Sequence, residues 1–193
     1  MNNRIINSTS HEFLIDIFRA LNFAAIKHRK QRRKGAAGIP YINHPIEVAV
    51  LLIKTMKEYS KEILIASILH DVLEDTETTP EELKQQFGKD VLDLVLEVTD
   101  DMTLPSPERK KRQILHADTL SYEARCIKIA DKTCNVRDIL KTRIYWSRKQ
   151  KIRYIEWAIK VISGIRNSHK ELILEFDNSI QSASDSLKYK FPV

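Results

Sequence analysis

The sequence predicts an all-α fold in which about eight to ten helices form one bundle. Only four Gly and six Pro occur in 193 residues, so long stretches of the chain lack helix breakers. Apolar residues recur at spacings of three and four, whereas no segment alternates convincingly as a half-buried strand would. The length suits a single domain, and a hydrophobic content of 42% is sufficient to form a core.

Composition also sets the expected boundaries and surroundings of the domain. We expect a flexible N-terminus over residues 1–10, one folded domain over residues 11–187 and a loose tail over residues 188–193. Cys126 and Cys134 lack a CxxC spacing, which favours free thiols in a reducing compartment. No apolar run reaches the ~20 residues of a membrane span, and the first residues lack a signal-peptide core. We therefore expect a cytoplasmic protein with no membrane partner.

The first predicted helix runs from about residue 11 to residue 30. Its apolar positions have helical spacing: Phe13, Leu14, Ile17, Phe18, Leu21, Ala24 and Ala25. A basic run, residues 29–34, and a glycine-containing loop follow. Such a run is typical of a solvated surface or of a nucleic-acid patch. His44 comes just before Pro45, which we expect to open a helix that ends near Tyr59.

The next predicted helix, residues 61–75, ends in the most polar segment of the chain. An apolar run over residues 63–69 leads directly into His70, Asp71, Glu74 and Asp75. One continuous helix places residues four apart on the same face. An imidazole and three carboxylates are costly to bury without a cation. The alternative is an ordinary solvated helix end.

The remaining helices follow from local signals. Thr79 as N-cap, Pro80 at the first position and Glu82 three residues after the cap predict a short helix that stops near Gly88. Paired aspartates and two prolines make residues 99–107 a loop. We expect Trp146 and Trp157 to be packing residues. Further helices are predicted over residues 89–99, from Arg109, from Ser121 through Arg137, over residues 148–170 and from Glu171 to Leu187.

Several polar side chains in these segments form a candidate metal site. Two imidazoles and two carboxylates suit a divalent transition ion such as manganese, iron or zinc. Such an ion lowers the pKa of its water and shields a phosphate. Glu74 and Asp75 are expected to orient or deprotonate that water, or to protonate a leaving oxygen. The candidate ligands are His44, His70, Asp71 and Asp131.

The basic run supplies groups that suit a phosphorylated ligand. Arg32, Arg33 and Lys34 offer cations for phosphates and, in the arginines, a planar surface for a base. Together with the candidate metal site they predict a metal-dependent phosphohydrolase. The acidic cluster close by would repel a polyanion unless a metal bridges the two, so no nucleic-acid partner is expected.

These motifs together resemble a known family. His44, then His70-Asp71, then Asp131 match the H…HD…D pattern of the HD-domain superfamily, which is all-helical and mostly phosphohydrolytic. The wider pattern is similar to the hydrolase domain of the RelA/SpoT alarmone family, especially its small single-domain, metazoan SpoT homologue type. It extends from about Phe18 to about Gly164. Its boxes are Arg33-Lys34, residues 40–45, His70-Asp71-x-x-Glu74-Asp75, residues 98–110 and Lys128-x-x-Asp131-x-x-x-Asn135-x-Arg137.

The resemblance implies a single HD-domain helical bundle with a defined activity. That activity is manganese-dependent hydrolysis of the 3′-pyrophosphate of guanosine tetra- and pentaphosphate, which yields pyrophosphate and GDP or GTP; Fe²⁺ and Zn²⁺ are alternative ions. His44, His70, Asp71 and Asp131 would hold the ion, and Glu74 with Asp75 would position and activate water. Asn135 would contact the nucleotide near the ribose. Arg33 and Lys34 would flank base and phosphates, with Arg32 and Arg33 interchangeable in that role.

Two alternative functions remain open, and the length of the chain limits the expected activity. The first alternative is a substrate of another nucleotide class, such as NADPH with removal of its 2′-phosphate. A non-catalytic nucleotide-binding HD module is a further alternative, although no ligand and neither acidic residue of the Glu-Asp pair is missing. The length leaves no room for synthetase and regulatory domains, so we expect hydrolysis of a guanosine nucleotide without synthesis.

Overall fold

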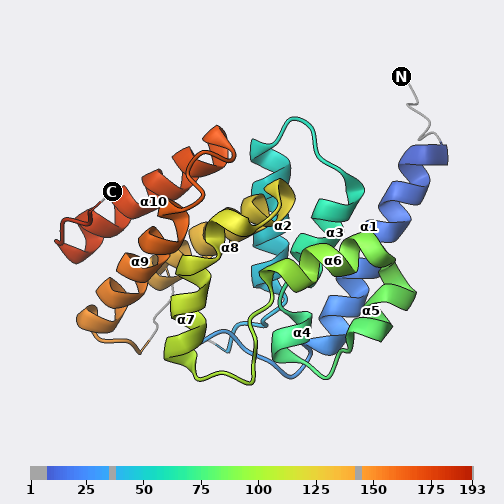
Figure 1. The fold of residues 1–193 in the computed structure, drawn as a ribbon, viewed down its shortest axis with the longest axis horizontal. Helices are drawn as coiled ribbons and strands as arrows, with labels where there is room; N and C mark the ends of the chain where they lie inside the picture. Colours follow the sequence, from blue (N-terminus) through green and yellow to red (C-terminus); the bar gives the residue numbers. More distant parts are fainter. Residues whose placement is uncertain (1–7, 35–37, 142–144, 193) are drawn as a thin grey trace.

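A computed structural model gives the fold, which it describes for residues 8–34, 38–141 and 145–192 (Figure 1). Within these ranges the chain is helical and has no strand; an isolated antiparallel bridge joins Arg32 to Pro40. The predicted all-α fold is therefore confirmed. The helices are α1 (Ser8–Lys27), α2 (Asn43–Thr55), α3 (Lys61–Leu69), α4 (Val72–Asp75), α5 (Pro80–Phe87), α6 (Lys89–Val98), α7 (Ser106–Leu115), η1 (Ala117–Thr119), α8 (Tyr122–Lys141), α9 (Arg148–Ser163) and α10 (Lys170–Leu187).

Helices α3 and α8 form the centre of the bundle. Helix α3 packs against α1, α2, α6 and α8, while α8 also contacts α9 and α10. Every residue from Ile63 to Leu69 is buried, because a helix that is apolar on all sides is enclosed by its neighbours. In Figure 1, α9 and α10 lie on one side of α8, and α1, α5 and α6 lie on the other. The loop after α1, helix α4 and the start of α7 lie together along the lower edge of that view.

The predicted helix over residues 61–75 is wrong, because the structure breaks it into α3 and α4 at His70 and Asp71. The Ser67 hydroxyl donates to the carbonyl of Leu64 at 2.7 Å, and His70 Nδ1 lies 2.7 Å from the Ser67 carbonyl oxygen. Such side-chain bonds to the backbone compete with the helical ladder. Asp71 takes φ −102° and ψ −3°, and α4 begins at the next residue. His70 and Glu74 therefore do not share one helical face.

Other boundaries differ where tertiary contacts decide them. Helix α2 begins at Asn43 rather than at Pro45, which places His44 in its first turn, and it ends at Thr55. The predicted helix over residues 148–170 ends at Ser163. A Cβ added at Gly164 would lie 3.3 Å from the Ala117 Cβ, so this glycine allows the chain to turn close against η1. Helix α7 starts at Ser106 and includes Pro107 in its first turn, where a missing N–H costs nothing.

Locally encoded features agree with the prediction. The Thr79 hydroxyl oxygen accepts a hydrogen bond from the Glu82 amide at 3.2 Å, Pro80 opens α5 and Gly88 follows its last residue. Ser121 Oγ likewise accepts from the Ala124 amide at the start of α8. In each case the signal is complete within a few residues, so no distant contact is needed to place the boundary.

The described residues begin at Ser8 and end at Pro192. Residues 1–7 of the predicted flexible N-terminus lie outside the described residues. After α10, the Phe191 side chain is buried and its ring centroid lies 4.9 Å from that of Tyr189. Cys126 and Cys134 are buried free thiols. No helix in the described part of the chain has the length and apolar character needed to cross a membrane.

Candidate metal and nucleotide site

Four of the predicted side chains converge where α2, the α3–α4 turn and α8 meet. His44 Nε2 lies 3.1 Å from Asp131 Oδ1 and 3.7 Å from Asp71 Oδ2. His70 Nε2 lies 3.0 Å from Asp71 Oδ2 and 3.9 Å from Asp131 Oδ1. Ligand atoms of His44, His70 and Asp131 all lie within 4.8 Å of one another. Two imidazole nitrogens and two carboxylate oxygens therefore surround one small volume.

The hydrogen bonding of His70 shows that this volume suits a cation. Its Nδ1 is 2.7 Å from the Ser67 carbonyl oxygen, which can only accept, so Nδ1 carries the proton of the neutral ring. Among the described residues, the other nitrogen, Nε2, makes no hydrogen bond of good geometry, although it is buried 3.0 Å from Asp71 Oδ2. Burial opposes the charged imidazole, but Asp71 raises the pKa of His70 to about 9. The lone pair of His70 Nε2 faces the Asp71 carboxylate, so a proton or a metal ion must lie between the two groups. Imidazole nitrogens and carboxylate oxygens together suit a divalent transition ion.

Two neighbours that the sequence analysis did not single out hold the carboxylates in place. The Tyr41 hydroxyl donates to Asp71 Oδ2 at 2.6 Å. Burial of Tyr41, and then the negative charge of Asp71, raise the pKa of Tyr41, so the hydroxyl keeps its proton and remains a donor. Lys132 Nζ donates to Asp131 Oδ2 at 2.9 Å. Burial opposes ionisation of Asp131, but Lys132 and then His44 hold the pKa of Asp131 well below its ordinary value. The carboxylates are thus ionised and oriented, as metal ligands must be.

A hydrogen-bonded chain continues from Asp131 along α8. Asn135 Nδ2 donates to Asp131 Oδ1, and the Arg33 guanidinium donates to Asn135 Oδ1 at 2.8 Å. Arg33 Nε also donates to Asp138 Oδ2 at 2.9 Å. The Arg33 guanidinium lies 5.5 Å from the centre of the Tyr41 ring. Asn135 therefore links the ligand cluster to an arginine held in place by an ion pair.

The structure distinguishes the two arginines whose roles the sequence left interchangeable. Arg33 is half-buried and pairs with Asp138, whereas Arg32 is exposed. Arg32 Nη1 donates to the carbonyl oxygens of Arg29 at 2.8 Å and of Gln31 at 2.9 Å. Arg33 is thus fixed against α8, while the exposed Arg32 keeps its charge close to solvent.

These groups border a pocket of about 330 Å³, a size within the range for small ligands. Asp71 belongs both to the ligand cluster and to the wall of this pocket. The wall combines cationic, acidic and apolar side chains. Its side chains include Arg32, Arg33, Lys34 and Arg109; Asp71, Glu74 and Asp75; and Met102, Ile139, Trp146 and Tyr154. Such a wall suits a ligand that carries both phosphates and an aromatic base.

The two acidic residues of α4 have different surroundings. Glu74 is half-buried, and its Oε1 accepts a hydrogen bond from the Asp100 backbone amide at 2.6 Å. Burial, then the charge of Asp71, raises the pKa of Glu74 to about 7. Asp75 is exposed, and its Oδ2 accepts from Gln31 Nε2 at 2.9 Å. Glu74 therefore has the acid–base properties that proton transfer near neutral pH requires.

All the predicted site residues thus lie in the ligand cluster or on the pocket wall. The site also contains residues to which the sequence analysis gave no role in it. Tyr41 lies three residues before His44, and Lys132 is adjacent to Asp131, so both had positional signals. Trp146, predicted as a packing residue, borders the pocket, and its ring centroid lies 5.7 Å from that of Tyr154. No spacing in the sequence indicates that contact, because it joins a loop to the next helix.

Comparisons with known proteins agree with this arrangement. Residues 20–155 match the family described as HD domain. The guanosine-3′,5′-bis(diphosphate) 3′-pyrophosphohydrolase MESH1 of Xenopus tropicalis is 44% identical over 163 residues, which cover 84% of this chain and 91% of that protein. The protein of the same name from Homo sapiens is 45% identical over 157 residues, which cover 81% of this chain and 88% of that protein.

A solved structure shares the fold as well as the sequence pattern. It is described as a metazoan ortholog of SpoT that hydrolyses ppGpp and plays a role in starvation responses. The superposition has a TM-score of 0.84 at 38% sequence identity, and it covers 87% of this chain and 95% of that chain. The chain therefore belongs to the HD-domain family and, within it, to the group of small metazoan SpoT-type proteins.

Proposed function

We propose that the chain is a metal-dependent hydrolase of the alarmone guanosine 3′,5′-bis(diphosphate), which it converts to GDP and pyrophosphate; the pentaphosphate would give GTP. The observation that carries the proposal is the junction at Asp71, where the cluster of metal-ligating side chains meets a pocket whose wall carries arginine, lysine and aromatic side chains. Relatives 44% and 45% identical to this chain are named for the same reaction. The chain would act without synthetase activity.

The proposed ligands of the metal ion are His44, His70, Asp71 and Asp131. A bound divalent ion would lower the pKa of water and shield the charge of the phosphates. Mn²⁺ is the proposed ion, because a mixture of imidazole and carboxylate donors suits it and it also accepts phosphate oxygens; Fe²⁺ and Zn²⁺ are the alternatives. The support from the protein is the buried, unpartnered Nε2 of His70 beside an ionised carboxylate.

Glu74 is the proposed general base. Its pKa of about 7 lets it accept a proton from the attacking water and return that proton to the leaving group. Water would attack the phosphorus bonded to the ribose 3′-oxygen, the bond between these two atoms would break, and the 3′-oxygen would take up the proton as pyrophosphate departs. Asp75, hydrogen-bonded to Gln31, would help to orient the water.

The remaining pocket residues are proposed to bind the nucleotide. Arg32 and Lys34 would contact phosphates at the exposed part of the pocket, and Asn135 would lie near the ribose. Arg33 would present its planar guanidinium to the base from a fixed position, because Asp138 and Asn135 hold it. Trp146 and Tyr154 would provide the apolar side of the same space.

A product assay tests the proposal. The protein, stripped with chelator and reloaded with Mn²⁺, is incubated separately with guanosine tetraphosphate and with NADPH, and phosphate and pyrophosphate are measured independently. We expect equal amounts of GDP and pyrophosphate from the guanosine nucleotide, and product formation slower by about 10²–10⁴-fold with the Glu74→Gln variant. Phosphate from NADPH without pyrophosphate from the guanosine compound would assign another substrate. No product from either nucleotide would indicate a non-catalytic nucleotide-binding module.

A further inference from the structure

The segment that follows α6 donates a backbone hydrogen bond directly to Glu74. The amide of Asp100 lies 2.6 Å from Glu74 Oε1, although the two residues are 26 positions apart in the sequence. Among the described residues, Oε1 is the Glu74 oxygen that accepts a hydrogen bond. The placement of this one amide therefore determines how the Glu74 carboxylate is oriented in the pocket.

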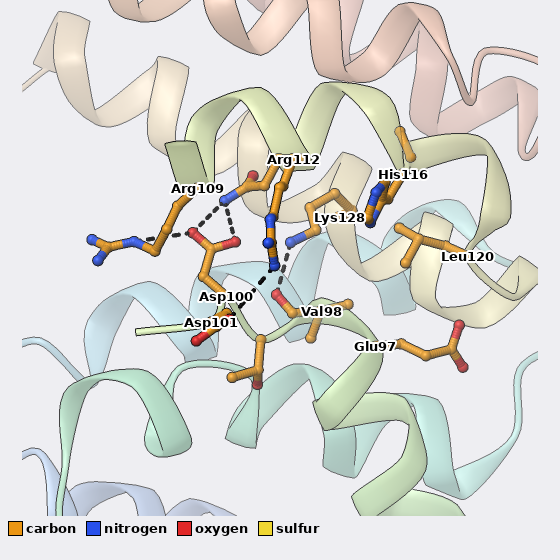
Figure 2. Close-up of a pocket in the computed structure, with 12 residues that line it drawn as sticks. Glu97, Val98, Asp100, Asp101, Arg109, Arg112, His116, Leu120 and Lys128 are labelled. Atoms are coloured by element: carbon orange, nitrogen blue, oxygen red, sulfur yellow. Dashed lines mark hydrogen bonds and ion pairs between the residues drawn. The ribbon is translucent and has the colours of Figure 1, made fainter. Parts of the chain in front are cut away.

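The side chain of Asp100 is itself held from α7. Gln113 Nε2 donates to both carboxylate oxygens of Asp100, at 2.8 Å each, and Arg109 Nε lies 3.6 Å from Asp100 Oδ2. Figure 2 shows the Arg109 side chain reaching the Asp100 carboxylate. Arg109 also donates to the carbonyl oxygen of Leu104 at 3.0 Å, which ties the loop before α7 to the same helix.

A second hold on the segment comes from α8, the helix that carries Asp131. Lys128 Nζ donates to the carbonyl oxygen of Val98 at 2.8 Å, and only 7% of the Lys128 surface is exposed (Figure 2). The Thr99 hydroxyl donates to the carbonyl of Val95 at 2.7 Å. The two residues before Asp100 are thus fixed to α8 and α6, and the Asp100 side chain is fixed to α7.

We propose that Asp100 is a positioning residue for Glu74: its carboxylate, held by Gln113 and Arg109, fixes the backbone amide that orients Glu74 Oε1. This inference rests on the proposed function, in which Glu74 activates water. Gln113 lines a separate pocket of about 180 Å³ and does not line the pocket of about 330 Å³ that Glu74 borders. A change at Gln113 therefore reaches Glu74 through Asp100 rather than through the substrate.

The test exchanges donor and acceptor roles between the two side chains. In Gln113→Glu a carboxylate replaces the donor and repels Asp100, so kcat should fall about tenfold or more while KM stays within about twofold, because misplaced catalytic groups lose turnover. The double variant Asp100→Asn with Gln113→Glu restores the hydrogen bond with reversed roles, and kcat should return to within about threefold of wild type. The matched control is Asp101→Asn, whose exposed carboxylate pairs with Arg112 instead and whose kcat should be unchanged.

A second readout does not depend on turnover. Amide hydrogen exchange at Asp100 should be slow in the wild type, faster in Gln113→Glu and slow again in the double variant. If the wild type releases no pyrophosphate, the proposed function fails, and the exchange pattern still decides whether Gln113 and the Asp100 carboxylate hold this amide in place. Unchanged exchange in Gln113→Glu, or an unchanged kcat in an active enzyme, would overturn the positioning role.

Discussion

Asp131 and Glu74 are carboxylates with different partners, and their substitution should separate metal binding from turnover. Asp131 is oriented by Lys132 toward the two imidazoles, whereas Glu74 is tied to the Asp100 amide. Asp131→Ala should abolish retention of Mn²⁺ and activity while it preserves the helical circular dichroism signal. Glu74→Ala should retain the metal and lower kcat by about 10²–10⁴-fold, the usual contribution of a general base. Metal analysis by mass spectrometry with a pyrophosphate assay measures both.

The reverse result would refute this division of roles. If Glu74→Ala lost the metal while Asp131→Ala kept it, the ligand and the base would have to be exchanged. Asp131→Asn is a suitable matched variant, because it preserves shape and removes the charge that the ion requires.

The pH dependence of turnover should report the ionisation of Glu74. Burial and the charge of Asp71 raise the pKa of Glu74 from 4.5 to about 7, and a base must be ionised, so kcat should fall as pH decreases through that pKa. A bound dication offsets part of the Asp71 charge, which places the acidic limb between 4.5 and about 7. A kcat profile over pH measures this limb.

Asp75→Asn provides the comparison for that profile. Because Asp75 is exposed and is proposed only to orient water, its removal should lower the rate without moving the acidic limb. A limb that shifts or disappears in Asp75→Asn would assign the titrating base to Asp75 instead.

Among the helices, α5 offers a test of local stability away from the chemistry. The Thr79 oxygen accepts from the Glu82 amide, so Thr79→Ala leaves that amide without its cap and should cost about 0.5–2 kcal/mol. A chain of this size should then lose roughly 2–4 °C in Tm per kcal/mol. Thr79→Ser retains the oxygen and should behave almost as wild type, and kcat should be unchanged in both. A large loss of turnover in Thr79→Ala would show that α5 supports the site more directly.

The helices also show which features a sequence can specify. The start of α5 was predicted correctly because its cap, proline and glutamate act within a few residues. The predicted helix over residues 61–75 was wrong because periodicity does not reveal that Ser67 and His70 bond to the backbone and break it. Gly164 ends α9 against Ala117, a contact between segments far apart in the chain.

In the candidate site, too, some features could be predicted from the sequence and others depend on contacts between distant segments. His44, His70, Asp71 and Asp131 were recognisable from residue type and order, and the structure places them around one volume. The roles of their orienting partners were not predicted: Tyr41 and Lys132 lie close to ligands in the sequence, but a tyrosine or lysine near a histidine or aspartate is too common to indicate a hydrogen bond by itself. The contact between Glu74 and Asp100 depends on how α6 and α7 pack, so only the fold reveals it.

For the molecule as a unit, the ligand set predicts that metal binding stabilises the fold. The ligands come from α2, from the turn between α3 and α4 and from α8, so an ion would join segments far apart in the chain. At a free metal concentration of 100 times Kd, the expected gain is about 2.7 kcal/mol. Thermal denaturation with Mn²⁺ and with chelator should therefore differ in Tm by several degrees. Asp131→Ala should show no such difference; an equal shift in that variant would place the binding elsewhere.

The most direct measurement is a titration of the chelator-stripped protein with Mn²⁺, in which bound metal and the rate of pyrophosphate release from guanosine tetraphosphate are followed together. A site formed by His44, His70, Asp71 and Asp131 should take up a single tight equivalent, and the rate should rise in proportion to its occupancy. Full pyrophosphate release from the stripped protein, or tight uptake of the ion without any release, would contradict a metal-dependent hydrolase.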